Sequence, residues 1–227
     1  MLLKDLIEKN KITEDLLKNV NNKILHNKVR GISSNSKEIK KGYIFVAIKG
    51  KNFDGAEYIA EAEKLGAFLI IAEEACNKKV FSVKKGTARQ IYTLLLSSFY
   101  IKQPKQIIGV TGTNGKTSTV EFCRQLWALA GWKAASMGTL GTKTETAINK
   151  SVYKNKEENL TTFEPSDLYK KLNFLVEEKI SHLALEASSH GIDQYRLDGV
   201  NFSGAVFTNL SHDHLDYHGN TENYFST

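Results

Sequence analysis

The spacing of hydrophobic residues along the chain predicts alternating strands and helices. Two short apolar runs, Tyr43–Ile48 and Phe68–Ile71, are typical of buried strands. Between them, Ala56–Leu65 has the apolar spacing of an amphipathic helix and ends at Gly66, a residue that commonly terminates helices. These three segments together predict a β-α-β unit.

Helical patterns flank this unit on both sides. Residues 1 to about 30 predict short helices, and their apolar positions fall in two groups, Leu2, Leu3 and Leu6, then Leu16, Leu17 and Val20. A longer apolar stripe from Thr87 to Ile101 predicts one helix. Pro104 follows it, so we place a domain boundary at 102–105 and expect domains of residues 1–103 and 104–227.

The second half of the chain alternates more regularly. The expected elements are strands 107–110, 133–137, 181–185 and 202–207 and helices 116–130 and 166–178. Such alternation predicts an α/β fold with a mostly parallel sheet covered by helices, in which ligands bind at the carboxyl ends of the strands. Polar segments follow four of the strands, and we expect them to share one edge: Gly112–Ser118, Gly138–Thr139, Glu186–His190 and Thr208–His214.

The most informative of these segments is GVTGTNGKTS, from Gly109 to Ser118. Glycines before a helix allow backbone N–H groups to point into one concavity, and the helix N-terminus favours an anion. Lys116 adds a mobile charge, and the Thr117 hydroxyl suits Mg²⁺. The strict phosphate-loop pattern fails because it needs glycine at Val110, so a glycine-rich turn without a ligand is the alternative. The expected ATP-binding residues are Gly112, Thr113, Asn114, Gly115, Lys116, Thr117 and Ser118.

Glu186 is the candidate acidic metal ligand. It ends the apolar run 182–185, where nucleotide-hydrolysing folds place a second acidic residue behind the phosphate loop. One threonine hydroxyl and one carboxylate are an adequate protein contribution to Mg²⁺, which retains waters. The alternative is a carboxylate that caps a neighbouring loop, and a large distance between Glu186 and Thr117 would favour it.

Four of the 6 histidines crowd together near the end of the chain, with two aspartates among them: His190, His212, His214 and His218, with Asp213 and Asp216. A zinc site is disfavoured because no cysteine accompanies them and the spacing matches no structural zinc pattern. We expect one histidine to lie near the metal of a bound nucleotide and the others to pack or form local hydrogen bonds.

Two serines, Ser188 and Ser189, adjoin this group, but the G-x-S-x-G elbow of a serine hydrolase is missing. Hydroxyl groups followed by Gln194 and Arg196 instead suit a phosphorylated or carboxylated ligand, because hydroxyls donate and a guanidinium pairs with such groups bidentately.

Composition excludes several classes of function. A chain of 227 residues with 41% hydrophobic residues forms one large or two ordinary domains. The net charge of +6 comes from lysines scattered among acids, which disfavours nucleic acid and suits small anionic ligands. The charged N-terminus and the lack of a long apolar run predict a cytoplasmic protein without membrane insertion.

Five segments together resemble the Mur ligases of bacterial cell-wall synthesis, and the resemblance spans nearly the whole chain. They are SSNSKEIKKGYIFVAIKGKNFDG, GVTGTNGKTSTVEF, LTT, LEASSHGIDQYRL and VFTNLSHDHLDYHG. The family's own phosphate loop, G-T-N-G-K-T-[ST], accounts for the mismatch at Val110. SSHG together with DHLDYHG resembles the branch that adds the third peptide residue. The resemblance implies a small N-terminal α/β domain that binds UDP, followed by a phosphate-loop central domain.

The resemblance also implies roles for individual residues. The UDP-sugar end would be held by Ser34, Ser36, Lys51, Asn52 and Phe53, and the muramoyl-peptide part by Thr161, Thr162, Ser188, Gln194 and Arg196. The catalytic residues would be Lys116, Glu186, Asn209 and His214, with Thr117, Glu186 and His214 near Mg²⁺. Lys37 and Leu160 depart from residues common in the family.

The implied activity is ATP-dependent addition of a diamino acid to UDP-N-acetylmuramoyl-L-alanyl-D-glutamate through an acyl phosphate. We expect the enzyme to be a monomer. The alternatives are a non-catalytic module that binds nucleotide or UDP-muramoyl peptide, and a later ligase of the same family such as MurF. The family carries a carbamylated lysine and a third domain after DHLDYHG, whereas this chain stops at Thr227. We therefore expect the front portion of a ligase, with little turnover by itself.

Overall fold

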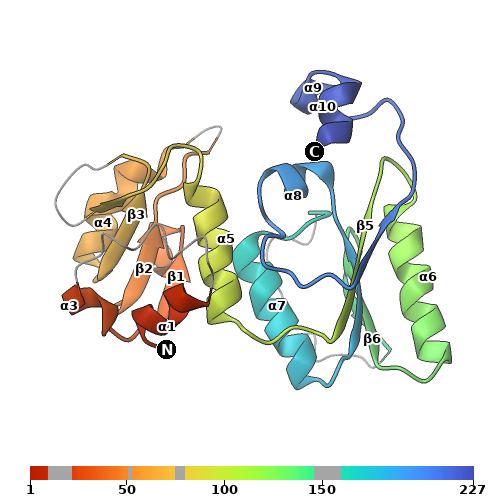
Figure 1. Ribbon diagram of the computed structural model, residues 1–227, viewed down its shortest axis with the longest axis horizontal. Helices are drawn as coiled ribbons and strands as arrows, with labels where there is room; N and C mark the ends of the chain where they lie inside the picture. Colours follow the sequence, from red (N-terminus) through yellow and green to blue (C-terminus); the bar gives the residue numbers. More distant parts are fainter. Residues whose placement is uncertain (10–21, 51–52, 75–79, 146–159) are drawn as a thin grey trace. The chain divides into compact units, whose positions relative to one another are not determined.

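The chain divides into two compact units, Met1–Ile101 and Lys102–Thr227, and each is described by itself (Figure 1). The structure is a computed structural model that describes residues 1–9, 22–50, 53–74, 80–145 and 160–227. The helix expected around Leu16 to Val20 and the candidate residues Lys51 and Asn52 lie outside the described residues.

The first unit contains a parallel sheet in the order β1-β2-β3-β4. Its elements are α1 (Leu3–Glu8), α3 (Asn22–Leu25), β1 (Gly31–Ser33), η1 (Ser36–Glu38), β2 (Tyr43–Val46), η2 (Gly55–Tyr58), α4 (Ile59–Lys64), β3 (Leu69–Ala72), β4 (Val80–Ser82) and α5 (Ala88–Phe99). The expected β-α-β unit is confirmed, because β2 and β3 are parallel and α4 connects them. A 3₁₀ turn, η2, forms the first part of the helix expected from Ala56, and the sequence pattern did not predict the short strands β1 and β4.

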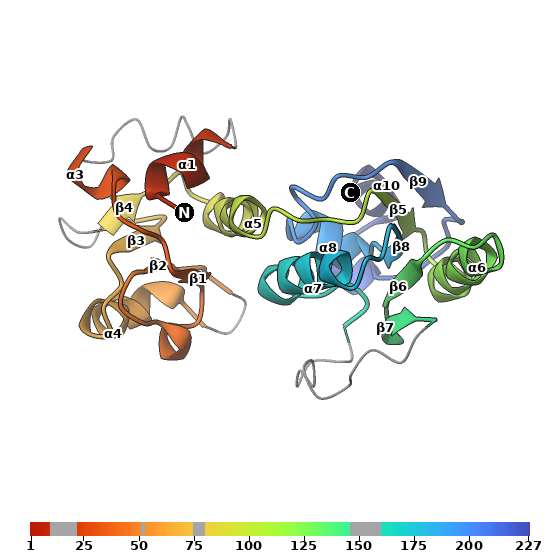
Figure 2. The same cartoon turned by 90° about the horizontal axis from the view of Figure 1, so that it is seen from below.

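The core of the first unit lies on both faces of this sheet. Phe45 and Ile70 pack with Ile59 of α4 in one buried cluster. Side chains alternate along a strand, so the buried Ile44 and Ile71 face the opposite side, where α5 contacts β1 and β2. Figure 2 shows α4 and α5 on opposite faces of the sheet.

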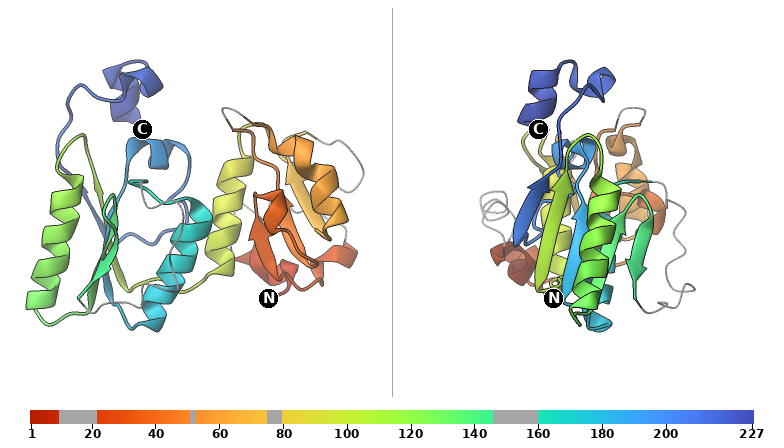
Figure 3. Two further views of the ribbon diagram at one scale, coloured as in Figure 1. Left: turned by 180° about the vertical axis from the view of Figure 1, so that it is seen from behind. Right: turned by 90° about the vertical axis from the view of Figure 1, so that its right-hand side faces the viewer.

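The second unit is built on a five-stranded sheet in the order β7-β6-β8-β5-β9. Its elements are β5 (Gln106–Thr111), α6 (Lys116–Leu129), β6 (Ala134–Gly138), β7 (Gly141–Thr144), α7 (Pro165–Glu177), β8 (His182–Glu186), α8 (Ser189–Asp193), β9 (Gly204–Phe207), α9 (Leu215–His218) and α10 (Thr221–Ser226). The views in Figures 2 and 3 show α6 on one face of the sheet and α7 on the other. The expected α/β fold with a mostly parallel sheet is confirmed, and the antiparallel edge strand β7 is the part that the pattern did not predict.

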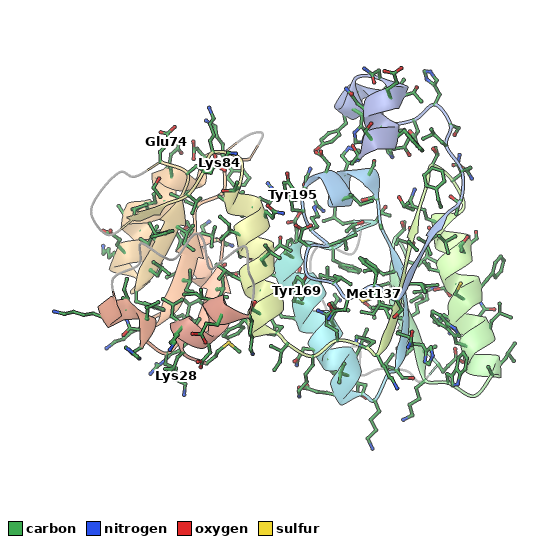
Figure 4. All side chains as sticks on the ribbon, viewed as in Figure 1. Lys28, Glu74, Lys84, Met137, Tyr169 and Tyr195 are labelled. Carbon is green, nitrogen blue, oxygen red and sulfur yellow. The ribbon has the colours of Figure 1, made fainter. Side chains whose placement is uncertain are left out.

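Four parallel strands, β5, β6, β8 and β9, bring their carboxyl ends to one edge of the second unit. This confirms that the four polar segments share that edge. Figure 1 shows the loop between β5 and α6, the helix α8 and the α9–α10 segment at the same end. Below this edge the interior is apolar, with Met137 of β6 and Tyr169 of α7 both fully buried (Figure 4).

The helices of the described part are short. The longest, α6, has 14 residues. None of the described helices has the length and apolar character needed to cross a membrane.

Candidate functional site

The loop between β5 and α6 requires glycine at its first position. Gly112 has a backbone φ of +123°, a conformation that residues other than glycine rarely adopt. A Cβ atom there would lie 2.2 Å from the Thr208 hydroxyl oxygen and 2.8 Å from the Asn209 carbonyl oxygen. The loop therefore passes close against the segment that follows β9, and it enters α6 through Gly115 at the N-cap.

Asn209 braces this loop. Its Oδ1 accepts the Asn114 N–H at 3.1 Å, its Nδ2 donates to the Asn114 carbonyl at 3.1 Å, and its own carbonyl accepts the Thr113 N–H at 2.9 Å. The Thr208 hydroxyl also donates to the Asn114 carbonyl, at 2.7 Å. The N–H groups of Thr113 and Asn114 are engaged in these hydrogen bonds. Among the described residues, no hydrogen bond engages the amides of residues 115–118, which can therefore face an anion at the start of α6. Sequence analysis placed Asn209 in catalysis, and the structure adds this bracing contact.

Lys116 lies across the mouth of the loop. Its Nζ donates to the Gly112 carbonyl at 2.7 Å and to the Thr113 carbonyl at 3.0 Å. Burial lowers the pKa of Lys116, while the nearby charges of Glu186 and Asp213 act in the opposite direction. The ammonium group is thus held between the loop and acidic side chains at the edge of the sheet.

Glu186 is buried at this edge, with 1% of its surface exposed. Its Oε2 accepts the Thr117 hydroxyl at 3.1 Å and the Thr139 hydroxyl at 3.2 Å, and its Oε1 accepts the Thr139 N–H at 3.0 Å. A Cβ atom on Gly138 would lie 2.1 Å from Oε1, so glycine is needed for the carboxylate to fit. The structure brings Glu186 to Thr117, and the same carboxylate also holds the turn after β6.

The oxygen atoms around Glu186 are of the type that binds magnesium. The hydroxyls of Thr117 and Thr139 and the carboxylate of Glu186 are the hard oxygen ligands that Mg²⁺ prefers. Among the described residues, no hydrogen bond or ion pair joins His214 to Thr117 or Glu186, and His214 instead pairs with Asp213 at 3.6 Å. The described residues also contain no group of three or more His, Cys, Asp or Glu side chains that could hold a metal. The metal role of His214 therefore stays a prediction.

A cluster of aromatic rings joins α8 to α9. The His190 ring lies 4.0 Å from Tyr217, 4.9 Å from His214 and 5.7 Å from His218, measured between ring centroids. Burial, and then the charges of the two neighbouring histidines, lower the pKa of His190. The Ser189 hydroxyl lies 3.0 Å from His218 Nε2. These rings pack against one another, and His218 lies within hydrogen-bond distance of Ser189.

The residues assigned to the muramoyl peptide form one cluster from two distant segments. The Thr162 and Ser188 hydroxyls are 2.9 Å apart, and Arg196 Nη1 donates to the Thr162 carbonyl at 2.9 Å. Gln194 Oε1 accepts from Arg196 Nη2 at 2.8 Å. The Thr161 and Thr139 hydroxyl oxygens lie 3.1 Å apart, and Thr139 also contacts Glu186, which links this cluster to Glu186. The structure thus brings all five residues to the same edge.

Two residues of this edge were missed by sequence analysis as site residues. Thr139 donates two hydrogen bonds to Glu186, and Glu164 forms an ion pair with Arg196 at 2.9 Å. Thr139 follows a strand at the shared edge, which was a usable signal. Glu164 stands two positions after Thr162, but only the fold shows that its side chain reaches Arg196.

In the first unit, a small cavity of about 100 Å³ lies at the carboxyl ends of β2 and β3. Its lining residues are Ala47, Lys49, Asp54, Ala56, Ala72, Glu73, Glu74 and Lys85. The predicted residues Ser34, Ser36 and Phe53 are not among them, although Ser34 follows β1 and Ser36 is buried at the start of η1. Figure 4 labels Glu74 at this end of the unit, and Phe53 is 57% exposed.

The second unit has a mostly parallel sheet with helices on both faces. A glycine-bearing loop runs from its buried strand β5 into the N-terminus of α6. These features define the class of α/β proteins that bind phosphate groups at the carboxyl edge of the sheet. Comparison with known families is more specific. Residues 110–227 match the Mur ligase middle domain, and residues 28–96 match the Mur ligase family, catalytic domain. The chain belongs to the Mur ligase family, which confirms the resemblance seen in its motifs.

Similar proteins carry one recurring name. The chain is 42% identical over 199 residues to the UDP-N-acetylmuramoyl-L-alanyl-D-glutamate--2,6-diaminopimelate ligase of Brucella melitensis, a match that covers 86% of this chain and 39% of the relative. It is 44% identical over 202 residues to the ligase of the same name from Rickettsia rickettsii, which covers 88% of this chain and 41% of the relative. This chain thus spans about two fifths of the length of the curated relatives it matches.

Solved structures agree with this assignment. A ligase structure of that name aligns with a TM-score of 0.77 at 25% identity and covers 100% of this chain and 43% of its own. MurF ligase from Thermotoga maritima, solved in complex with ADP, shares the fold with a TM-score of 0.55 at 24% identity, over 88% of this chain and 42% of its own.

Proposed function

We propose that this chain carries the ATP site and the UDP-muramoyl-dipeptide site of an ATP-dependent amide ligase of peptidoglycan synthesis. The ligase would join UDP-N-acetylmuramoyl-L-alanyl-D-glutamate to the amine of a diamino acid, and the names of the relatives favour 2,6-diaminopimelate. One observation carries the proposal: the hydroxyl of Thr117, beside Lys116 at the start of α6, lies 3.1 Å from the buried carboxylate of Glu186. Because ATP and UDP-sugars are cytoplasmic metabolites, we place the reaction in the cytoplasm.

At the ATP end, Lys116 and the first-turn amides of α6 would hold the terminal phosphates. An oxygen of the substrate carboxylate attacks the γ-phosphorus, the bond to ADP breaks, and an acyl phosphate forms; the amine then displaces phosphate and leaves an amide. Both the attacking and the leaving groups are anionic, so a preorganised ammonium group lowers the barrier. Thr117 and Glu186 would hold Mg²⁺, which neutralises phosphate charge when bound.

At the acceptor end, the cluster of Thr162, Ser188 and Arg196 would bind the dipeptide, because hydroxyl groups and a guanidinium suit carboxylates. In the first unit, Ser34, Ser36 and the cavity at the ends of β2 and β3 would bind the UDP-sugar end.

Isothermal titration calorimetry on the 227-residue chain tests the ATP site. We expect Lys116→Ala to weaken the affinity for a non-hydrolysable ATP analogue with Mg²⁺ by about 10-fold or more, the size of a lost charge-assisted hydrogen bond. Lys170→Ala, an exposed lysine on α7, is the matched control and should leave this affinity unchanged. Affinity for the UDP-muramoyl dipeptide should survive in both variants. Equal nucleotide affinity in the Lys116→Ala and unmodified chains would refute the assignment.

A hydroxylamine trap separates chemistry from binding alone. The chain is incubated with ATP, Mg²⁺, the UDP-muramoyl dipeptide and hydroxylamine. Hydroxylamine converts an acyl phosphate to a hydroxamate, and we expect this product to depend on Lys116. Binding of both ligands with neither hydroxamate nor released phosphate would instead show that these 227 residues bind the ligands without chemistry.

A further inference from the structure

The guanidinium group of Arg196 is largely committed to partners within the protein. Its Nε and Nη2 donate to Gln194 Oε1 at 3.2 and 2.8 Å, and its Nη1 donates to the Thr162 carbonyl at 2.9 Å. Nη2 also forms an ion pair with Glu164 Oε1 at 2.9 Å. A bidentate grip on a carboxylate uses two parallel N–H groups. In this conformation, one of the existing partners must leave before Arg196 can grip a ligand in that way.

Glu164 is the partner that a ligand carboxylate can best replace. Thr162 and Gln194 offer neutral oxygens, whereas Glu164 offers the same charge and shape as the ligand group. The Glu164 side chain is 34% exposed, compared with 13% for Arg196. It can therefore swing into solvent without unpacking its neighbours, while Thr162 is 1% exposed and fixed.

Glu164 also has a favourable place to go. It is the N-cap residue of α7, with an extended backbone at φ −62° and ψ 147°, yet its side chain makes no capping hydrogen bond. Negative charge is stabilised near a helix N-terminus. A carboxylate released from Arg196 would stay beside the positive end of its own helix, so the exchange costs little.

We propose that Glu164 is a placeholder for a carboxylate of the ligand at Arg196. It keeps the guanidinium oriented and charge-balanced until a D-glutamate carboxylate of the UDP-muramoyl dipeptide displaces it. This inference rests on the proposed function. It makes Glu164 a competitor that lowers the affinity for this carboxylate, because both carboxylates pair with the same guanidinium group.

Titration calorimetry with two ligands tests the proposal: the UDP-muramoyl dipeptide, and its diamide, in which both D-glutamate carboxylates are amides. We expect Glu164→Gln to tighten binding of the dipeptide by about 2- to 5-fold, the size of removing a partly exposed competing ion pair. Binding of the diamide should not change. Glu164→Asp, which keeps the charge but shortens the reach, should shift dipeptide affinity in the same direction.

The matched control is Glu177→Gln on the same helix, which removes an exposed ion pair with Lys102 at 3.2 Å and should alter neither affinity. Weaker dipeptide binding by Glu164→Gln would show that Glu164 only positions Arg196; that result overturns the placeholder and leaves the proposed function standing. Equal gains for dipeptide and diamide would overturn it as well. Failure of the unmodified chain to bind the dipeptide would overturn the proposed function and this inference together.

Discussion

The two units present similar sheet edges with different degrees of enclosure. In the second unit, Glu186 is 1% exposed and accepts three hydrogen bonds. In the first unit, the ion pair of Lys49 and Asp54 spans 3.6 Å with side chains 71% and 37% exposed. Charges held rigidly away from water stabilise developing charge far better than solvated ones. The comparison supports the proposal that chemistry takes place at the second edge and ligand recognition at the first.

The two edges also differ in how far apart along the chain their partners stand. In the first unit, Ser33 donates to Glu38, five positions away, at 2.8 Å. In the second unit, Thr117 and Glu186 are separated by 69 positions, and Asn114 and Asn209 by 95. The second edge therefore exists only when the whole sheet is assembled, and changes there should cost stability as well as binding.

The largest effect should come from Gly138→Ala. A Cβ atom 2.1 Å from Glu186 Oε1 forces the buried carboxylate to move, and such overpacking costs about 2–3 kcal/mol of unfolding free energy. Urea unfolding followed by tryptophan fluorescence measures it, since Trp127 and Trp132 both lie in the second unit. Gly204→Ala, where the nearest atom would be 3.9 Å away, is the control. Equal stability of the two variants would contradict the close approach.

Glu186→Gln should have the next largest effect. The side chain keeps its shape, but an amide nitrogen cannot accept the hydrogen bonds of Thr117 and Thr139, which costs about 1–2 kcal/mol. We also expect nucleotide affinity to lose its dependence on Mg²⁺. Calorimetry with and without Mg²⁺ checks this, and a preserved Mg²⁺ dependence would remove Glu186 from the proposed metal site.

Asn209→Ala should cost about 1 kcal/mol, because it removes the amide group that braces Asn114 from both sides. The freed loop should also bind nucleotide more weakly. The same fluorescence and calorimetric measurements apply, with the exposed Asn201→Ala as control. A variant with normal stability and weak nucleotide binding would point instead to direct contact between Asn209 and the ligand.

In the first unit, Asp54→Asn should change stability by less than about 0.5 kcal/mol, because exposed ion pairs contribute little. Asparagine still accepts the Ala56 N–H that Asp54 accepts at 2.9 Å, so the cap of η2 survives. Far-UV circular dichroism during urea unfolding measures this. A loss as large as that of Glu186→Gln would erase the contrast between the two edges.

The smallest effect concerns pH in the second unit. Burial, and then the charge of Lys105, lower the pKa of His182, whose ring stacks on Trp132 at 4.5 Å. The unfolded chain therefore binds more protons between the folded pKa and about 6.5, and stability rises with pH across that window. Unfolding midpoints from pH 5 to 7.5 should show this slope, and His182→Gln should reduce it.

Local features were predictable from the sequence. The β-α-β unit, the mostly parallel sheet and the strand–loop–helix turn at Gly112 follow from apolar spacing and from glycine before a helix. The pairing of Thr117 with Glu186 was also anticipated, because both follow strands whose carboxyl ends share an edge. These inferences succeed because periodicity and backbone conformation depend on neighbouring residues.

Apart from the pairing of Thr117 with Glu186, only the tertiary structure decided which side chains from distant segments contact one another. The antiparallel position of β7, the brace of Asn209 on Asn114, and the contact of Glu164 with Arg196 have no local pattern. Each depends on which strands lie side by side and on the exact distances between side chains from distant segments. A hydrophobic pattern specifies that a strand is buried, but hydrogen-bond geometry between distant residues is set only when the sheet order is set.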